Sequence, residues 1–158
     1  MKETELAGRP FPDIALPDLD GASRPVLGAA GSWNLVVIGH SDCGTTRLLV
    51  PYLKRMHDRR ASGSSVVLVL QDGREEARAF LADLHVDLPV RLEPEPYPLA
   101  QELHLETVPT LFLVGPAGLI ERGSEGFERA AIEDLAARLG VRPPFFLPED
   151  TAPALRPG

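Results

Sequence analysis

Three runs of consecutive apolar residues are the clearest pattern in the chain. They occupy residues 35–38, 66–70 and 111–114, and each is rich in branched aliphatic side chains. Because the alternate positions of these runs are not polar, both faces of each strand must be covered by other parts of the protein. The pattern therefore predicts three central strands of a buried sheet.

Two segments repeat their apolar positions at i, i+3, i+4 and i+7, the spacing of one helical stripe. They are Ala77, Phe80, Leu81 and Leu84 in the first segment, and Ile132, Leu135, Ala136 and Leu139 in the second. Asp72 is placed to cap the first helix, with Glu75 as its capping-box partner. Gly140 is placed to end the second.

A further helix is expected over residues 45–60, with a kink at Pro51, because proline removes one amide and clashes with the preceding turn. Its inward side chains are Leu48, Leu49, Tyr52, Leu53 and Met56. Pro98 suits the first turn of a short helix, and residues 88–92 suit a short strand. Residues 93–96 are expected to form a surface loop, and residues 115–118 a tight turn of an antiparallel hairpin.

The order of these elements predicts an α/β fold, with a central mixed β-sheet flanked by helices on both faces. One domain is expected over residues 1–140. Residues 141–158 form a proline-rich C-terminal extension that is partly packed or disordered. In this extension residues 145–147 are expected to pack back on the domain, and residues 149–158 to form a loose tail.

Composition narrows the classes of partner. The 158 residues carry a formal net charge of −7, whereas binding to nucleic acid requires clustered Lys and Arg side chains. Residues 1–8 are polar and acidic, and no apolar run approaches the length of a membrane span. The sequence thus predicts no nucleic-acid partner, no membrane partner and a cytoplasmic location, unless an export segment has been removed.

Cys43 is the one cysteine of the chain, so it cannot close an intramolecular disulfide. One cysteine and scattered histidines (His57, His85 and His104) do not give the ligand clusters that a metal ion needs. No metal and no cofactor are expected. The Cys43 thiol is then either an inert buried side chain or a reactive group.

Several segments resemble the thioredoxin-like superfamily, in its TlpA/ResA-like branch of thiol-disulfide oxidoreductases. Residues 8–21 are similar to that branch's segment G-x-x-A-P-D-F-x-L-x-D-L-x-G, and residues 107–110 read Thr-Val-Pro-Thr. The branch's motif Cys-x-x-Cys-[Arg/Lys]-x-x-x-Pro reads here Cys43-Gly44-Thr45-Thr46-Arg47-Leu48-Leu49-Val50-Pro51.

The resemblance implies roles for individual residues. It places Cys43 at the attacking position and Thr46 where the second, resolving cysteine is missing. It makes Val108-Pro109 the cis-proline peptide that presents backbone groups to a substrate. Asp42, where the family usually has an apolar residue, and Gly44 would meet the same substrate.

The chemistry of the residues leaves the pKa of the thiol open. A cysteine at a helix N-terminus is favoured as thiolate, and the Thr46 hydroxyl is within reach of the sulfur if it is not simply a surface hydroxyl. The Asp42 carboxylate opposes a second negative charge. His40 is either a group that tunes the thiol or a structural residue.

Three functions remain. The first is a thiol-disulfide oxidoreductase that acts through Cys43 alone, with protein thiols or disulfides, or glutathione, as external partner. The second is a non-catalytic module that binds a peptide or protein beside Val108-Pro109. The third is a one-cysteine peroxidase, although the expected Thr or Ser three residues before Cys43 is His40. The chain is expected to be a monomer or a homodimer.

Overall fold

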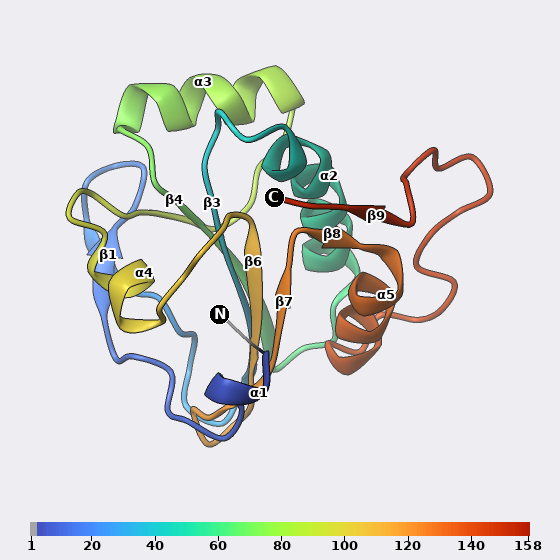
Figure 1. The fold of residues 1–158 in the computed structure, drawn as a ribbon, viewed down its shortest axis with the longest axis horizontal. Helices are drawn as coiled ribbons and strands as arrows, with labels where there is room; N and C mark the ends of the chain where they lie inside the picture. The colour runs from blue at the N-terminus through green and yellow to red at the C-terminus, as the bar shows by residue number, and fades with distance from the viewer. Residues whose placement is uncertain (1–2) are drawn as a thin grey trace.

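The computed structural model describes residues 3–158 and centres on a five-stranded sheet of order β5-β4-β3-β6-β7 (Figure 1). Its strands are β3 (Trp33–Gly39), β4 (Ser64–Leu70), β5 (Val90–Leu92), β6 (Thr110–Val114) and β7 (Ile120–Glu125). β3 runs parallel to β4 and antiparallel to β6. β4 runs parallel to β5, and β7 runs antiparallel to β6. The predicted mixed sheet and its three central strands are confirmed.

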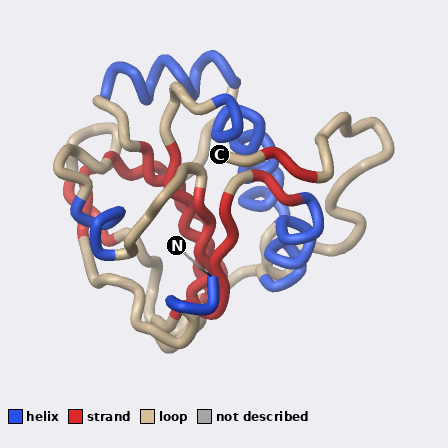
Figure 2. Tube along the Cα trace, in the orientation of Figure 1, coloured by secondary structure: helices blue, strands red, loops and turns tan. Residues whose placement is uncertain are grey.

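Helices and short strands surround this sheet (Figure 2). The helices are α1 (Glu3–Leu6), α2 (Gly44–Arg59), α3 (Arg74–Leu84), α4 (Pro98–Glu102) and α5 (Arg129–Arg138). β1 (Ala15–Pro17) pairs with β2 (Ser23–Pro25), and β8 (Phe127–Glu128) pairs with β9 (Leu155–Arg156). In the described chain no helix combines the length and the apolarity needed to cross a membrane.

The alternation of side chains along β3 divides the core into two layers. Leu35 and Val37 face α2, α3 and α5, whereas Val36 and Ile38 face α1, α4 and β1. Figure 1 shows α2 and α5 on one side of the sheet and α4 on the other. Both faces of β3 are therefore buried, which explains why residues 35–38 are apolar at every position.

The cap predicted for α3 is wrong. Gly73 precedes the first helical residue, and no side chain caps the helix. Asp72 turns away from this helix and accepts hydrogen bonds from Ser41. The end of α5 agrees with its prediction, because Gly140 follows it in the left-handed region, at φ 81°.

The prediction that residues 93–96 lie on the surface is wrong at Glu93. This side chain is fully buried, and its Oε1 accepts a hydrogen bond from the Ala100 amide in α4, at 3.0 Å. Burial raises the pKa of the Glu93 carboxyl, against the lowering effect of the α4 amides. Glu93 therefore holds α4 to the end of β5.

The C-terminal extension is packed. Phe145 and Phe146 are buried against Tyr52 and Phe127, as expected for this apolar segment. The loose tail expected over residues 149–158 is wrong, because Asp150 forms a two-pronged ion pair with Arg55 at 2.6 and 2.9 Å. Beyond it, β9 pairs with β8.

Because Asp150 is paired with Arg55, we expect the stability of the protein to depend on pH in the acidic range. The hydrogen bonds from Arg55 lower the pKa of Asp150 to about 2, whereas the pKa of this carboxyl in the unfolded chain is near 3.8. The contribution of the ion pair to the free energy of unfolding is therefore complete above pH 3.8 and is lost as the pH falls toward 2. We expect Asp150→Asn to lower the free energy of unfolding at neutral pH by about 1 to 2 kcal/mol. Urea unfolding of both proteins from pH 7 to pH 2 measures this difference.

The matched control is Asp58→Asn. Asp58 is exposed and pairs with Lys54, which lies one turn earlier in α2. Such a surface pair contributes only about 0.3 to 0.5 kcal/mol. A difference between wild type and Asp150→Asn that does not shrink between pH 4 and pH 2 would contradict the assignment.

Candidate functional site

Cys43 lies between the end of a central strand and the start of α2. The buried strand β3 ends at Gly39, and a three-residue loop leads to Cys43, which has the extended conformation φ −86°, ψ 117°. Its carbonyl accepts the first helical hydrogen bond, from the Arg47 amide at 3.0 Å. The thiol thus sits at the amino-terminal end of a 16-residue helix, where amides without helical partners favour negative charge.

Two threonines determine the pKa of the Cys43 thiol. Partial burial raises this pKa, but hydrogen bonds from the amide and hydroxyl of Thr46 and from the amide of Thr45 together outweigh burial and lower it below its ordinary value. Thr46 is fully buried, so it is not a surface hydroxyl. The contacts in the structure thus favour a lowered pKa for Cys43, a direction that the sequence left open.

The absence of a side chain at Gly39 leaves room for the Thr46 side chain beside the thiol. A β-carbon placed on Gly39 would lie 2.7 Å from Cγ2 of Thr46, closer than side chains approach one another. Thr46 Oγ1 also accepts the His40 amide at 3.4 Å, which leaves its own proton for the sulfur. Sequence reasoning singled out Thr46 but not the glycine that makes room for it.

Asp42 does not offset the two threonines. Its side chain is 93% exposed and lies 3.9 Å from Nδ1 of His40, so water screens its charge from the thiol. Asp42 is therefore on the rim of the site, whereas Gly44 and Thr46 lie beside the sulfur.

Asp72 holds the loop that precedes Cys43. Its side chain is 2% exposed and accepts hydrogen bonds from both the amide and the hydroxyl of Ser41. His40 accepts the Asp42 amide through Nδ1, and its Nε2 lies 3.7 Å from the Asp72 carboxylate. His40 is thus engaged within the loop, and Asp72 is a site residue that sequence reasoning assigned to another task.

Val108 and Pro109 complete the site from the other side. The thiol donates a hydrogen bond to the Val108 carbonyl, at 3.4 Å, and the Val108–Pro109 peptide bond is cis. Thr110 is buried and donates its hydroxyl to the Thr107 carbonyl at 2.8 Å, which closes this turn at the start of β6. The structure brings Cys43, Gly44, Thr46, Val108 and Pro109 together, although 65 positions separate the thiol from Val108.

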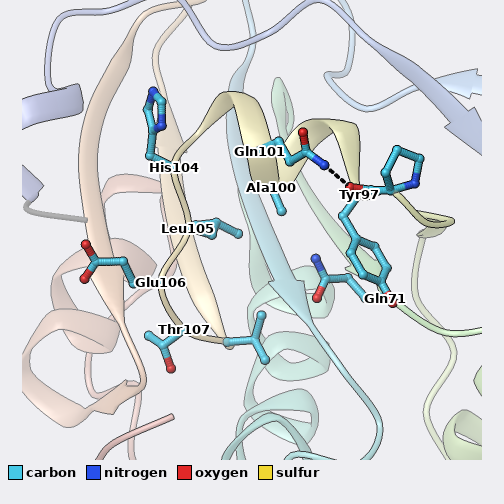
Figure 3. Close-up of a pocket in the computed structure, with 10 residues that line it drawn as sticks. Gln71, Tyr97, Ala100, Gln101, His104, Leu105, Glu106 and Thr107 are labelled. Atoms are coloured by element: carbon cyan, nitrogen blue, oxygen red, sulfur yellow. Dashed lines mark hydrogen bonds between the residues drawn. The ribbon is translucent and has the colours of Figure 1, made fainter.

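A cavity of about 450 Å³ adjoins Val108 (Figure 3). Its lining includes Tyr97 just before α4, Gln101 within α4 and His104 in the turn after it, together with Gln71, which directly follows β4. Its mixed polar and apolar walls could receive a side chain of a bound substrate. In the part of the chain that the structure describes, no three His, Cys, Asp or Glu side chains gather as metal ligands would.

The C-terminal segment also reaches the site. The Pro157 carbonyl accepts the Thr45 hydroxyl at 2.6 Å, and Gly158 lies against the Val108 carbonyl. Sequence reasoning missed this segment, because its short run of mixed residues carries no periodicity.

No protein-family profile matches the chain, and no curated protein matches it. Solved structures do. The protein from Chlorobium tepidum assigned as thiol:disulfide interchange protein DsbE is 28% identical, with a TM-score of 0.75 over 84% of this chain and 94% of its own.

The chain has a thioredoxin fold.

Two other structures share the fold at lower identity. StoA from Bacillus subtilis is 19% identical, with a TM-score of 0.67 over 80% of this chain and 96% of its own. A secreted thiol-disulfide isomerase from Corynebacterium glutamicum is 20% identical, with a TM-score of 0.69 over 82% of this chain and 84% of its own. The predicted thioredoxin-like fold is confirmed, and the similarity to the Chlorobium tepidum structure fits the resemblance to the TlpA/ResA-like branch.

Within this thioredoxin fold, the Thr46 hydroxyl predicts the reactivity of the thiol. Thr46→Val keeps the shape of the buried side chain but removes the hydrogen bond to the sulfur, so the pKa of Cys43 is expected to rise. The rate of alkylation by iodoacetamide at pH 7 should fall about three- to tenfold. Its pH profile, measured between pH 5 and pH 10, should move to higher pH.

Thr46→Ser is the matched control for this change, because it retains the hydroxyl and should retain the wild-type profile. Identical profiles for Thr46→Val and wild type would show that the hydroxyl does not bond the sulfur.

Proposed function

We propose that the chain is a thiol-disulfide oxidoreductase that acts through Cys43 alone. The observation that supports this most strongly is the thiol itself, whose pKa is lowered by Thr46 and Thr45 at the start of α2. Its sulfur lies 3.4 Å from the Val108 carbonyl, next to backbone that could pair with an extended substrate.

The proposed reaction has two steps. The Cys43 thiolate attacks a disulfide R–S–S–R′, which forms a Cys43–S–S–R mixed disulfide and expels R′–S⁻. A second thiolate, R″–S⁻, then attacks the R sulfur, which forms R–S–S–R″ and returns the Cys43 thiolate. The two steps exchange disulfide partners, and Cys43 ends in its starting oxidation state.

The resolving thiol must come from outside the chain. Thr46 stands where the resemblance puts the second cysteine, and a hydroxyl has no sulfur with which to form a disulfide bond. Protein thiols, protein disulfides and glutathione are the proposed partners. Val108, Pro109 and Gly44 would meet the substrate backbone, with Asp42 at the rim.

Mass spectrometry of the intact protein tests the proposal. Folded protein is exposed at pH 7 to oxidised glutathione, and in a separate sample to dilute peroxide. A single glutathione adduct that forms rapidly and is removed by excess thiol is the expected result.

Two outcomes favour the other functions. A thiol that reacts only after denaturation would overturn the redox proposal and leave the peptide-binding module. A faster gain of one or two oxygen atoms from peroxide would indicate the peroxidase. The cytoplasmic location and the monomeric or homodimeric state stay predictions, which fractionation of cells and light scattering can test.

A further inference from the structure

The segment of residues 155–158, here called the C-terminal strap, lies across the site of Cys43. Its first half is β9, in which Leu155 and Arg156 pair antiparallel with Glu128 and Phe127 of β8. The preceding Ala154 carbonyl accepts the Arg129 amide at 2.9 Å. The strap is thus held as an added strand, in the way that an extended peptide is held by the edge of a sheet.

The second half of the strap touches both walls of the site. On one wall, the Thr45 hydroxyl donates to the Pro157 carbonyl at 2.6 Å. On the other, a β-carbon placed on Gly158 would lie 2.1 Å from the Val108 carbonyl oxygen, so only glycine fits this position. Figure 1 shows the end of β9 beside the start of α2.

A third contact lies next to the thiol. A β-carbon placed on Gly44 would lie 2.6 Å from Nη2 of Arg156, so the guanidinium covers Gly44. The strap therefore fills the space along Thr45 and along Gly44 and Val108, and the proposed function assigns the last two to the backbone of a substrate.

We propose that the C-terminal strap occupies the place of an extended polypeptide substrate and selects between substrates of Cys43. Small disulfides react with the strap in place, whereas extended polypeptides react only after they displace it. This selection rests on the proposed function, because it concerns which disulfides reach the thiol.

The exposure of Cys43 and of the strap residues supports both halves of the proposal. Cys43 remains partly exposed with the strap in place, which leaves a path for a small disulfide. Leu155 is 63% exposed, and all four strap residues are exposed, so release of the strap uncovers little apolar surface.

The anchor of the extension lies outside the strap. Phe145 and Phe146 are buried, and Asp150 is paired with Arg55. These contacts can stay in place when residues 155–158 leave, so the strap is a separable lid rather than part of the core.

The reactivity of two matched substrates tests this selection. Glutathione and a glycine-serine peptide of about ten residues with one central cysteine are each joined in a mixed disulfide to 2-nitro-5-thiobenzoate. Attack by Cys43 on either releases the same coloured thiolate. The proteins compared are the full chain, a chain that stops after Ala154, and Gly158→Leu, which keeps the chain but collides with Val108.

We expect both variants to react with the peptide at least about tenfold faster than the full chain. In the full chain the peptide reacts only with the fraction of molecules in which the strap is displaced, and this fraction limits the rate. Their rates with the glutathione substrate should change less than about threefold. Equal acceleration with both substrates would overturn the selection, as would no acceleration with the peptide in either variant. Thermal unfolding identifies a variant that fails to fold, and the other variant then decides.

A binding measurement separates failure of the strap from failure of the proposed function. The same peptide, with serine in place of cysteine and a fluorescent label, is titrated into Cys43→Ser forms of the full chain and of the chain that stops after Ala154. Fluorescence anisotropy should give at least about tenfold tighter binding to the shorter chain. Tighter binding without disulfide exchange in any protein would overturn the proposed function alone, whereas equal binding would overturn the strap.

Discussion

Cys43→Ser is expected to take up no glutathione and to lose at least about 10³-fold in the rate of disulfide exchange. The hydroxyl of serine does not ionise near neutral pH, and oxygen does not form the mixed disulfide on which the proposed cycle depends. Since Cys43 is the one cysteine of the chain, no other sulfur can take over. Mass spectrometry of the intact protein and release of the coloured thiolate measure the two effects.

The same substitution should leave the fold intact. Cys43 is half-buried and outside both layers of the core, and a serine hydroxyl can donate to the Val108 carbonyl as the thiol does. The melting temperature should therefore change by less than about 4 °C. Exchange activity that survives in Cys43→Ser would rule out the proposed mechanism.

Thr46→Cys is expected to convert the single-thiol cycle into a self-contained dithiol cycle. The Thr46 side chain is fully buried and hydrogen-bonds to the Cys43 sulfur, so a thiol at this position lies within reach of it. A glutathione adduct on Cys43 would then be attacked from within the protein, which releases glutathione and leaves an intramolecular disulfide. Because this attack is intramolecular, the lifetime of the adduct should fall at least about 100-fold.

Intact mass detects the outcome, since the oxidised variant loses two hydrogen atoms and carries no glutathione. Ser23→Cys is the control, because it adds a second thiol on the exposed strand β2, away from the site. That protein should keep its adduct on Cys43. A stable adduct on folded Thr46→Cys would show that position 46 does not face the sulfur.

Sequence reasoning was most successful where a feature is local. The apolar runs predicted β3, β4 and β6, and the proline at position 51 falls within α2 as expected. It failed for Asp72, which stands near the start of α3 as a capping residue would. The Ser41 amide and hydroxyl compete for the same carboxylate from 31 positions away, and no local pattern reveals such a partner.

The pKa of the thiol illustrates the same limit. From the sequence, Thr46 is expected to lower the pKa of Cys43 and Asp42 to raise it, because both lie near Cys43 along the chain. The structure buries Thr46 against the sulfur and leaves Asp42 93% exposed, so the hydroxyl acts on the thiol and the carboxylate is screened.

By itself, the sequence determined the α/β arrangement, the strand and helix that flank Cys43, and the presence of one thiol without a partner cysteine. These follow from hydrophobic periodicity and residue identity, which are local properties of the chain. Only the tertiary structure decided the direction of the Cys43 pKa, the role of Asp72 and the place of the C-terminal strap. Each depends on contacts across long separations, as between Thr45 and Pro157, 112 positions apart, and folding alone brings such groups together.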